Sequence, residues 1–333
     1  MKYTLNDFDY HLPEELIAQK PATPRDHSRL LIYNRSDQSI TDDYFYNIGN
    51  YLPDNTSLVV NNSKVEKCRL LFNGGKIEIF VTKAVDNRVV EAMVRPGKKF
   101  KPGKTIQLTG QISAKTLSIA EDGIRTIQLS HSLDDPAIEP FKHTPFPPYI
   151  ERDESLSDRY QTVFAKDLGS KAAPTAGLHF TPELLQKLKE QGIEKKEVTL
   201  HVGLGTFAPV KADKIEEHVM HSEWYQISQR QADNLNNSKT ITAVGTTSVR
   251  VLESAPKKEK KFIACSGETD IFITPGYQFK STDHLITNFH LPKSTLLMLI
   301  SAFAGFDEVM RIYEHAIREK YRFYSFGDAM LIL

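Results

Sequence analysis

Apolar and polar positions alternate with a period of two between residues 66 and 149. The clearest alternating segments are residues 76–83, 88–95, 104–110, 115–120 and 124–130, and Gly, Asn or Asp stand at the breaks between them. Such alternation is typical of half-buried strands joined by tight turns. Five or six short strands at this spacing predict a small antiparallel barrel or sandwich.

On both sides of this stretch the pattern changes to that of an α/β protein. Short apolar runs at 30–33, 58–60, 240–244 and 285–289 predict buried strands, and residues 295–303 predict a helix that is apolar on all sides and therefore buried. Because the same pattern resumes after the interruption, we predict a discontinuous main α/β domain. It comprises residues 1–65 and 150–333, and residues 66–149 form a β-barrel domain inserted into it.

The stretch from residue 169 to residue 207 places one helix between two loops that carry histidine and glycine. Thr181 can cap the start of this helix and Gly192 can end it. With the helix docked on a sheet, His179 and His201 would lie at one rim, where α/β proteins bind ligands. Each of the two histidines has two interpretations: a functional group, or a structural side chain with its hydrogen bonds satisfied.

A second turn of small residues, Gly245-Thr246-Thr247, separates the strand 240–244 from a helix over 248–254. Such a turn aims backbone N–H groups at its ligand, which favours a carboxylate or a phosphate. The full dinucleotide or P-loop pattern is absent, so the turn alone does not identify the ligand.

The composition limits the partners, metal sites and cellular locations that this protein can have. Lys plus Arg and Asp plus Glu both number 42, so an RNA partner would need a local patch. One candidate patch is a set of lysines that is typical either of a solvated surface or of phosphate contacts: Lys98, Lys99, Lys101 and Lys104. Cys68 and Cys265 lack the spacing of a disulfide framework or a cysteine zinc site. Without a signal peptide or a membrane-spanning segment, we expect a cytoplasmic protein.

Histidine dominates the candidate chemistry. The sequence HVMH, with His218 and His221, could be half of a zinc site, which would make the protein a zinc hydrolase acting on a small molecule. Neither HExxH nor GxSxG occurs, however, and the neutral composition argues against a non-catalytic RNA-binding module. We therefore favour acid–base use of histidine, whose imidazole titrates near neutral pH.

Five long segments closely resemble the S-adenosylmethionine:tRNA ribosyltransferase-isomerase family of queuosine biosynthesis. They are GSKAAPTAGLHFT at 169–181, TLHVGLGTF at 199–207, VGTTSVRVLES at 244–254, ITNFHLPKSTLLMLISAF at 286–303 and YRFYSFGDAML at 321–331. The chain departs from the family pattern at Asn62, where Asp is typical, at Lys64, where Arg is typical, and at Lys171, where Val is typical.

The resemblance implies transfer of the ribosyl part of S-adenosylmethionine, a co-substrate, to 7-aminomethyl-7-deazaguanine at the wobble position of tRNA. Adenine and methionine leave, and the product is epoxyqueuosine. It further implies a discontinuous α/β domain with an inserted β-barrel and no metal, and we expect a monomer that binds no membrane. A base must remove a proton from the ribose 5′ carbon, and an acid should protonate the departing adenine.

The resemblance and this chemistry together give a set of expected site residues. We expect acid–base roles for His179, His201, His221 and Glu223, with Asp158 as a further carboxylate. Gly245, Thr246, Thr247 and Arg250 would hold the methionine carboxylate or a phosphate. Asn288 and His290 would contact the nucleoside or base, with Phe289 as a stacking face.

Overall fold

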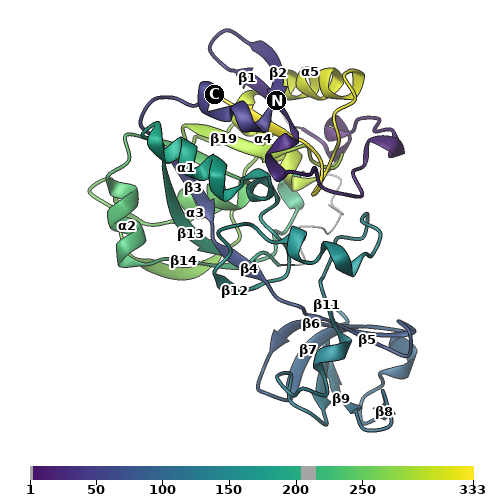
Figure 1. Cartoon of the computed structure of the whole chain (residues 1–333). Helices are drawn as coiled ribbons and strands as arrows, with labels where there is room; N and C mark the ends of the chain where they lie inside the picture. The colour runs from purple at the N-terminus through teal and green to yellow at the C-terminus, as the bar shows by residue number, and fades with distance from the viewer. Residues whose placement is uncertain (1–2, 204–214) are drawn as a thin grey trace. The chain divides into compact units, whose positions relative to one another are not determined.

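The structure is a computed structural model that describes residues 3–203 and 215–333. The chain divides into two compact units, one of Met1–Lys64 with Pro147–Leu333 and the other of Val65–Phe146. Figure 1 follows the chain through both units. Among the described residues, no helix is long and apolar enough to cross a membrane.

The larger unit is built on a mixed nine-stranded sheet in the order β18-β14-β13-β3-β15-β19-β20-β1-β2. Strands β13, β3, β15 and β19 run parallel to one another, whereas β20 is antiparallel to β19. The strands are β1 (Arg29–Asn34), β2 (Ser39–Tyr44), β3 (Thr56–Asn61), β13 (Glu194–Leu200), β14 (Glu223–Ile227), β15 (Thr240–Val244), β18 (Cys265–Thr269), β19 (His284–Asn288) and β20 (Ala329–Ile332). Two short pairs accompany the sheet: β4 (Ser63–Val65) with β12 (Asp167–Ser170), and β16 (Lys257–Lys258) with β17 (Lys261–Phe262).

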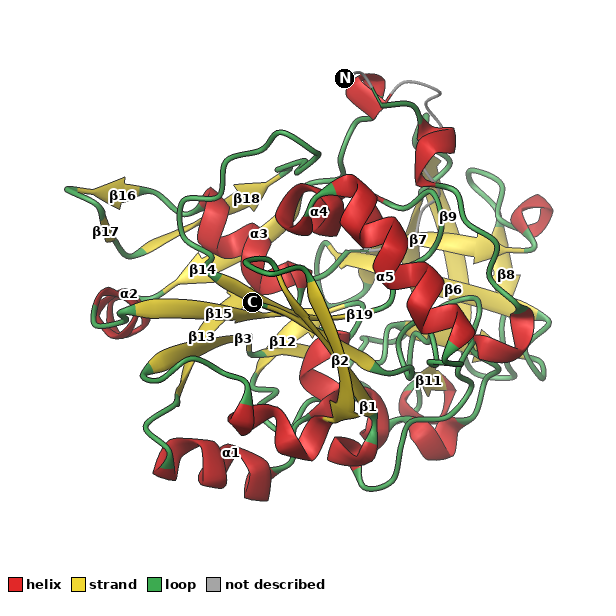
Figure 2. Ribbon diagram, turned by 90° about the horizontal axis from the view of Figure 1, so that it is seen from above, coloured by secondary structure: helices red, strands yellow, loops and turns green. Residues whose placement is uncertain are grey.

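Helices cover both faces of this sheet. They are α1 (Pro182–Glu190), α2 (Gln229–Asn236), α3 (Thr246–Ser254), α4 (Thr295–Ala304) and α5 (Phe306–Arg318). Figure 2 shows α1 on one side of the strands and α3 and α4 on the other. In β3, Leu58 and Val60 belong to the core that contains α1, and Val59 belongs to the core that contains α3 and α4. Because β3 is buried on both faces, its sequence is apolar at consecutive positions, not at alternate ones.

The helix α1 forms for the reasons that its sequence gives. The Thr181 hydroxyl accepts a hydrogen bond from the Leu184 N–H at 3.0 Å, and Gly192 just beyond the end has φ of +82°. Leu184 and Leu188 are buried on the side facing the sheet. The predicted cap and end of this helix are confirmed.

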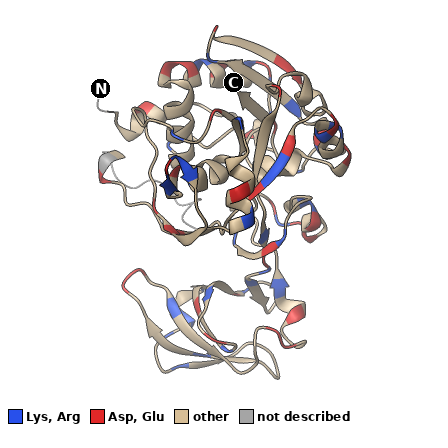
Figure 3. Cartoon of the chain, turned by 90° about the vertical axis from the view of Figure 1, so that its left-hand side faces the viewer, with Lys and Arg blue, Asp and Glu red and all other residues tan. Residues whose placement is uncertain are grey.

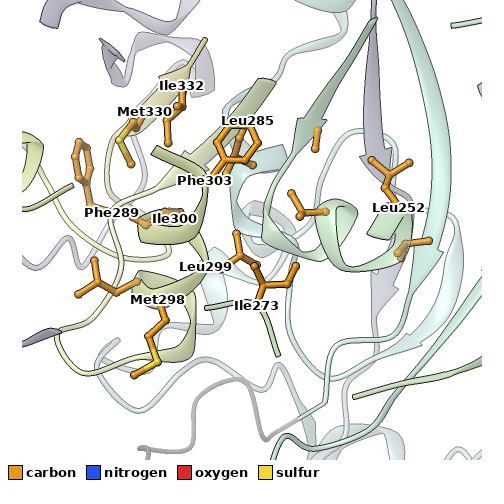
Figure 4. Close-up of a cluster of buried hydrophobic side chains, with 14 of the residues drawn as sticks. Leu252, Ile273, Leu285, Phe289, Met298, Leu299, Ile300, Phe303, Met330 and Ile332 are labelled. Carbon is orange, nitrogen blue, oxygen red and sulfur yellow. The ribbon is translucent and has the colours of Figure 1, made fainter. Parts of the chain in front are cut away.

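The apolar helix α4 is buried, as predicted. Met298 and Ile300 are fully buried, and Figure 4 shows them in one hydrophobic cluster with Leu285 of β19 and Met330 of β20. Burying side chains of this size contributes roughly 1.5–3 kcal/mol each relative to exposure. This layer therefore anchors the strands whose ends carry the candidate site.

The smaller unit contains a seven-stranded antiparallel sheet in the order β11-β5-β6-β7-β10-β9-β8. Its strands are β5 (Arg69–Phe72), β6 (Ile77–Ala84), β7 (Val89–Arg95), β8 (Thr105–Gln107), β9 (Ser113–Ile119), β10 (Arg125–Leu129) and β11 (Lys142–His143). The sheet curls, yet no strand pairing within 65–146 joins its two edge strands, β11 and β8. The predicted mixture of α/β and antiparallel β structure is confirmed at this coarse level.

Candidate functional site

The candidate site lies where the parallel strands of the larger sheet end. Strand β13 ends next to His201, β15 next to Gly245, and β19 at Asn288. Because these strands are parallel, their carboxyl ends meet at one edge of the sheet. Open α/β sheets bind their ligands at this edge.

Six of the predicted site residues line one pocket at this edge: Gly245, Thr246, Thr247, Asn288, Phe289 and His290. The pocket measures about 680 Å³ including its open mouth. It is also lined by Tyr149, Ala173, Pro174, Thr175, Ala176, Val202, Thr287, Leu291, Ser294, Leu296, Tyr324 and Ser325.

The turn at the start of α3 presents the first N–H groups of that helix to the pocket. Gly245 precedes the helix with φ of +86°, in the left-handed region that favours glycine, and no side chain caps the helix. The helix begins at Thr246, two residues earlier than predicted. The Thr247 hydroxyl is buried and has no hydrogen-bond partner among the described residues. An anionic group of a ligand would satisfy these donors.

His179 is buried, and both of its ring nitrogens are in use. Nδ1 lies 2.7 Å from the Ser28 hydroxyl, and Nε2 lies 3.1 Å from the Asn288 amide nitrogen. That nitrogen also lies 3.2 Å from the Tyr324 carbonyl, which can only accept. The amide therefore donates to Nε2, and His179 carries its proton on Nδ1. Burial lowers the pKa of His179 to about 4, so the ring is neutral at pH 7.

His290 and Phe289 also sit largely within the protein. The His290 Nε2 lies 2.8 Å from the Thr287 hydroxyl, and burial lowers the pKa of His290 to about 3. Phe289 is fully buried and packs against Phe323, with ring centroids 5.0 Å apart. Asn288 leaves its Oδ1 buried without a partner in the described part of the chain. Asn288 therefore keeps a buried hydrogen-bonding atom unused within the described chain.

His201 differs from His179 in having an unused ring nitrogen. Its ring lies against Trp224, with centroids 4.8 Å apart, and its Nε2 is buried without a hydrogen-bond partner in the described chain. A Cβ added to Gly169, whose φ is +140°, would come within 2.5 Å of the ring. Burial lowers the pKa of His201; Lys171 lowers it further, whereas Asp167 opposes the shift. A neutral imidazole with a free nitrogen can accept or donate a proton.

Lys171 also differs from an ordinary surface lysine. Burial lowers its pKa to about 8. Its backbone N–H donates to the carbonyl of Val202, a residue that lines the pocket. The backbone of Lys171 thus lies beside the rim, at a position where the family pattern has valine.

Glu223 and Arg250 form an ion pair with each other. Both are buried, and the second Glu223 oxygen accepts a hydrogen bond from the Gly203 N–H at 2.8 Å. Arg250 also donates to the Thr269 carbonyl at 3.2 Å. The pair therefore joins β14 to α3, and neither side chain lines the pocket.

The remaining predicted residues lie away from the pocket. His221 and Asp158 are exposed, and the Asp158 carbonyl accepts a hydrogen bond from Arg25 at 3.2 Å. His218 packs its ring against Phe272. Across residues 3–203 and 215–333, no three His, Cys, Asp or Glu side chains gather in a group that could hold a metal ion. Residues 204–207, the end of one family motif, lie outside the described residues.

Several functional contacts escaped the sequence analysis. Ser28 forms a hydrogen bond with His179 from a segment far away in the sequence. Gly169 packs against His201 from the other histidine loop. Gly169 opens the motif 169–181, so its presence was a signal, but its packing against His201 was not readable from spacing. The loop that contains Ser28 gave no indication that this hydroxyl would pair with His179.

Comparisons with known proteins agree on one family. A family model described as queuosine biosynthesis protein matches residues 5–332. Two curated relatives are named S-adenosylmethionine:tRNA ribosyltransferase-isomerase. The one from Thermotoga petrophila is 47% identical over 99% of both chains, and the one from Halothermothrix orenii is 49% identical over the same shares.

A solved structure gives the same result. The crystal structure of S-adenosylmethionine tRNA ribosyltransferase from Thermotoga maritima is 40% identical, covers 98% of this chain and 100% of its own, and has a TM-score of 0.56. The resemblance seen in the sequence motifs is confirmed. The chain belongs to the queuosine biosynthesis protein family, that of the S-adenosylmethionine:tRNA ribosyltransferase-isomerases.

Proposed function

We propose that this chain transfers and isomerises the ribosyl moiety of S-adenosylmethionine onto 7-aminomethyl-7-deazaguanine at the wobble position of tRNA. Epoxyqueuosine-tRNA forms, and adenine and methionine are released. The observation that carries this proposal is the match over 99% of both chains to relatives with this named activity. S-adenosylmethionine is the co-substrate, and the tRNA is the partner.

The start of α3 is the proposed site for the methionine carboxylate. Gly245, Thr246 and Thr247 line the pocket at a helix N-terminus, where backbone donors and the helix dipole favour an anion. The unpartnered Thr247 hydroxyl adds a further donor. Arg250 is assigned a structural role instead, because Glu223 already neutralises it.

His201 is the proposed acid–base residue. This role is supported by its Nε2, which has no partner in the described part of the chain, by its lowered pKa, and by its place next to Val202 of the pocket. His179 is proposed as a positioning residue, because it accepts a hydrogen bond from Asn288 and has no nitrogen left for substrate. Asn288 and His290 are proposed to contact the nucleoside.

Residues 65–146 are proposed to be an inserted domain with a barrel-like antiparallel sheet. Its curled sheet and the return of the chain to the α/β pattern support this assignment. We further propose that the protein works as a monomer without a metal cofactor.

Adenine release from S-adenosylmethionine tests the proposed function. We expect release with tRNA that carries 7-aminomethyl-7-deazaguanine and none with tRNA that carries guanine at the same position. Release without any tRNA, or none with the modified tRNA from folded protein, would contradict the proposal. The zinc-hydrolase alternative predicts instead that activity depends on bound metal.

A further inference from the structure

One region of the larger sheet has a polar face. Alternate residues of β13 point to the side of the sheet that α1 covers at β3. They are Glu197 and Thr199, and His201 continues the series just beyond the end of the strand. The Thr199 hydroxyl lies 2.8 Å from Asn62 Oδ1 and 3.1 Å from Asp167 Oδ2. The sheet face is therefore polar at this edge, whereas it is apolar under α1.

A groove of about 1110 Å³, including its open side, lies at this edge of the sheet and extends from the polar face to helix α2. We call it the β13–β14 groove. It is lined by Asn62, Lys166, Asp167, Lys195, Lys196, Glu197, Gln226, Ser228, Arg230, Gln231 and Asn234.

The charges of the β13–β14 groove favour an anionic partner. Four lining residues are basic and two are acidic. Lys195 pairs with Glu197, whereas Lys166 and Arg230 are exposed and form no ion pair within residues 3–203 and 215–333. Asn62, in place of the Asp typical of the family, removes one negative charge from this groove. In the view of Figure 3, basic and acidic residues are otherwise interspersed, so an attraction for RNA must come from such local sites.

The β13–β14 groove leads to a pair of rings. Gln226 in the groove and Trp224 are two residues apart on β14, so their side chains share a face of the sheet. Trp224, the chain's one tryptophan, is 37% exposed and lies against His201. Glu268, across from Trp224 on β18, accepts a hydrogen bond from Ser222 at 2.8 Å. Single-stranded RNA bases stack on exposed aromatic rings while cations of the same surface bind the phosphates; here the exposed ring is that of Trp224, and the cations are Lys166 and Arg230 of the groove.

A second exposed aromatic pair provides a contrast. Tyr44 and Tyr46 stack at a centroid distance of 5.6 Å, and Tyr46 is also 37% exposed. Tyr44 lies across from Arg29 of β1, as Trp224 lies across from Glu268 of β18, so the charge of the cross-strand neighbour does not distinguish the two aromatic pairs. The Arg29 guanidinium is placed over the Tyr321 ring and donates to the Glu319 carbonyl, whereas the face that carries Trp224 continues to a groove with the exposed cations Lys166 and Arg230.

We propose that the β13–β14 groove, with Trp224 and His201 at its end, is the surface on which the single-stranded anticodon loop of the tRNA docks. Lys166 and Arg230 contact phosphates, and a base stacks on Trp224. His201 adjoins Val202, which lines the pocket, so the nucleotide next to the stacked base reaches the pocket. This inference rests on the proposed function, which supplies the tRNA.

Intrinsic fluorescence tests the docking surface on the unmodified protein, because its tryptophan signal comes from Trp224 alone. An anticodon stem–loop RNA carrying 7-aminomethyl-7-deazaguanine is titrated in, and free N-acetyltryptophanamide corrects for absorption by the RNA. We expect quenching that saturates with binding, together with protection of Trp224 from acrylamide. Saturated RNA binding, measured independently by gel shift, with no change in fluorescence would overturn the proposal.

Matched variants provide a second test of the docking surface. Trp224→Ala should weaken RNA binding by about 5- to 100-fold, and Trp224→Tyr should restore most of it. Lys166→Glu with Arg230→Glu should weaken it on the order of 10-fold and reduce its salt dependence. Tyr46→Ala, with the same exposure, should leave binding unchanged. If Lys98→Glu/Lys99→Glu loses RNA binding while the β13–β14 groove variants bind RNA normally, the RNA binds elsewhere and the proposal is wrong.

Adenine release separates the two proposals. If modified tRNA supports adenine release while the fluorescence of Trp224 does not change on RNA binding, the docking surface is wrong and the proposed function stands. If the RNA quenches Trp224 but no adenine is released, the docking surface stands and the proposed reaction fails.

Discussion

The two histidine loops on either side of α1 use the same side chain in opposite ways. His179 is enclosed, with Ser28 on one ring nitrogen and Asn288 on the other. His201 lies between Gly169 and Trp224 and keeps Nε2 without a described partner. Both rings have a lowered pKa, so desolvation does not distinguish them. The two histidines are distinguished by the number of hydrogen bonds that the protein already makes to each ring, because only an unused nitrogen can exchange a proton with substrate.

Replacing His201 should have the largest effect on activity. His201→Ala is expected to lower the rate of adenine release by about 10²–10⁴-fold, the usual contribution of a general acid or base. The unfolding midpoint should stay near that of the unchanged protein, since Nε2 has no hydrogen-bond partner among residues 3–203 and 215–333. Single-turnover adenine release and thermal unfolding measure the two effects. Unchanged release would remove His201 from the catalytic residues.

Replacing His179 should instead cost stability. His179→Ala leaves the buried Ser28 hydroxyl and one Asn288 donor without their partner, and an unsatisfied buried group costs about 1–3 kcal/mol. We expect a loss of roughly 3 kcal/mol in the free energy of unfolding, measured in urea. Adenine release per folded molecule should fall much less than in His201→Ala. A variant with full stability but no turnover would show that His179 acts directly in the reaction.

Acid should weaken the fold through the same residue. The pKa of His179 is about 4 in the folded protein and near 6.5 when unfolded, so the unfolded chain binds the proton more tightly between these values. The stabilisation is complete above pH 6.5 and is lost as pH falls towards 4, by up to about 3 kcal/mol. Urea unfolding across this range measures the slope. His179→Asn should flatten it, and an equally steep slope in that variant would contradict the assignment.

Crowding His201 should have a smaller effect. An added Cβ in Gly169→Ala meets the tip of the His201 ring, which can rotate away, so we expect about a 10-fold loss of adenine release with a stability cost of about 1–3 kcal/mol. Gly276→Ala is the matched control, because Gly276 also has positive φ, +102°, but its Cβ would meet nothing within 4 Å. The comparison separates ring displacement from backbone strain. Equal activity losses in the two variants would show that backbone strain, and not the ring, matters.

The sequence was informative where a residue's role follows from its own strand or helix. Gly245 and Asn288 come at the ends of apolar runs, and both line the pocket. Thr181 caps a helix through a hydrogen bond three residues away, which local spacing reveals. Local patterns of this kind account for the predicted strands, helices and strand-end residues.

The sequence was uninformative where the role depends on tertiary pairing. Glu223 and Arg250 meet only because β14 packs beside β13 and α3 lies across them, and β14 had no recognised strand pattern. The sequence therefore predicts an acid–base role for Glu223 and an anion-binding role for Arg250, although the two side chains neutralise each other. The same limitation applies to His179, whose partner Ser28 lies 151 positions away.

The most direct test of the contrast between the two loops is a long-range ¹⁵N NMR spectrum of histidine-labelled protein, with signals assigned by single-histidine variants. His179 should appear as one neutral tautomer with its proton on Nδ1, unchanged by S-adenosylmethionine and modified tRNA. His201 should shift when both substrates are added. A substrate-dependent change at His179 with none at His201 would contradict the account.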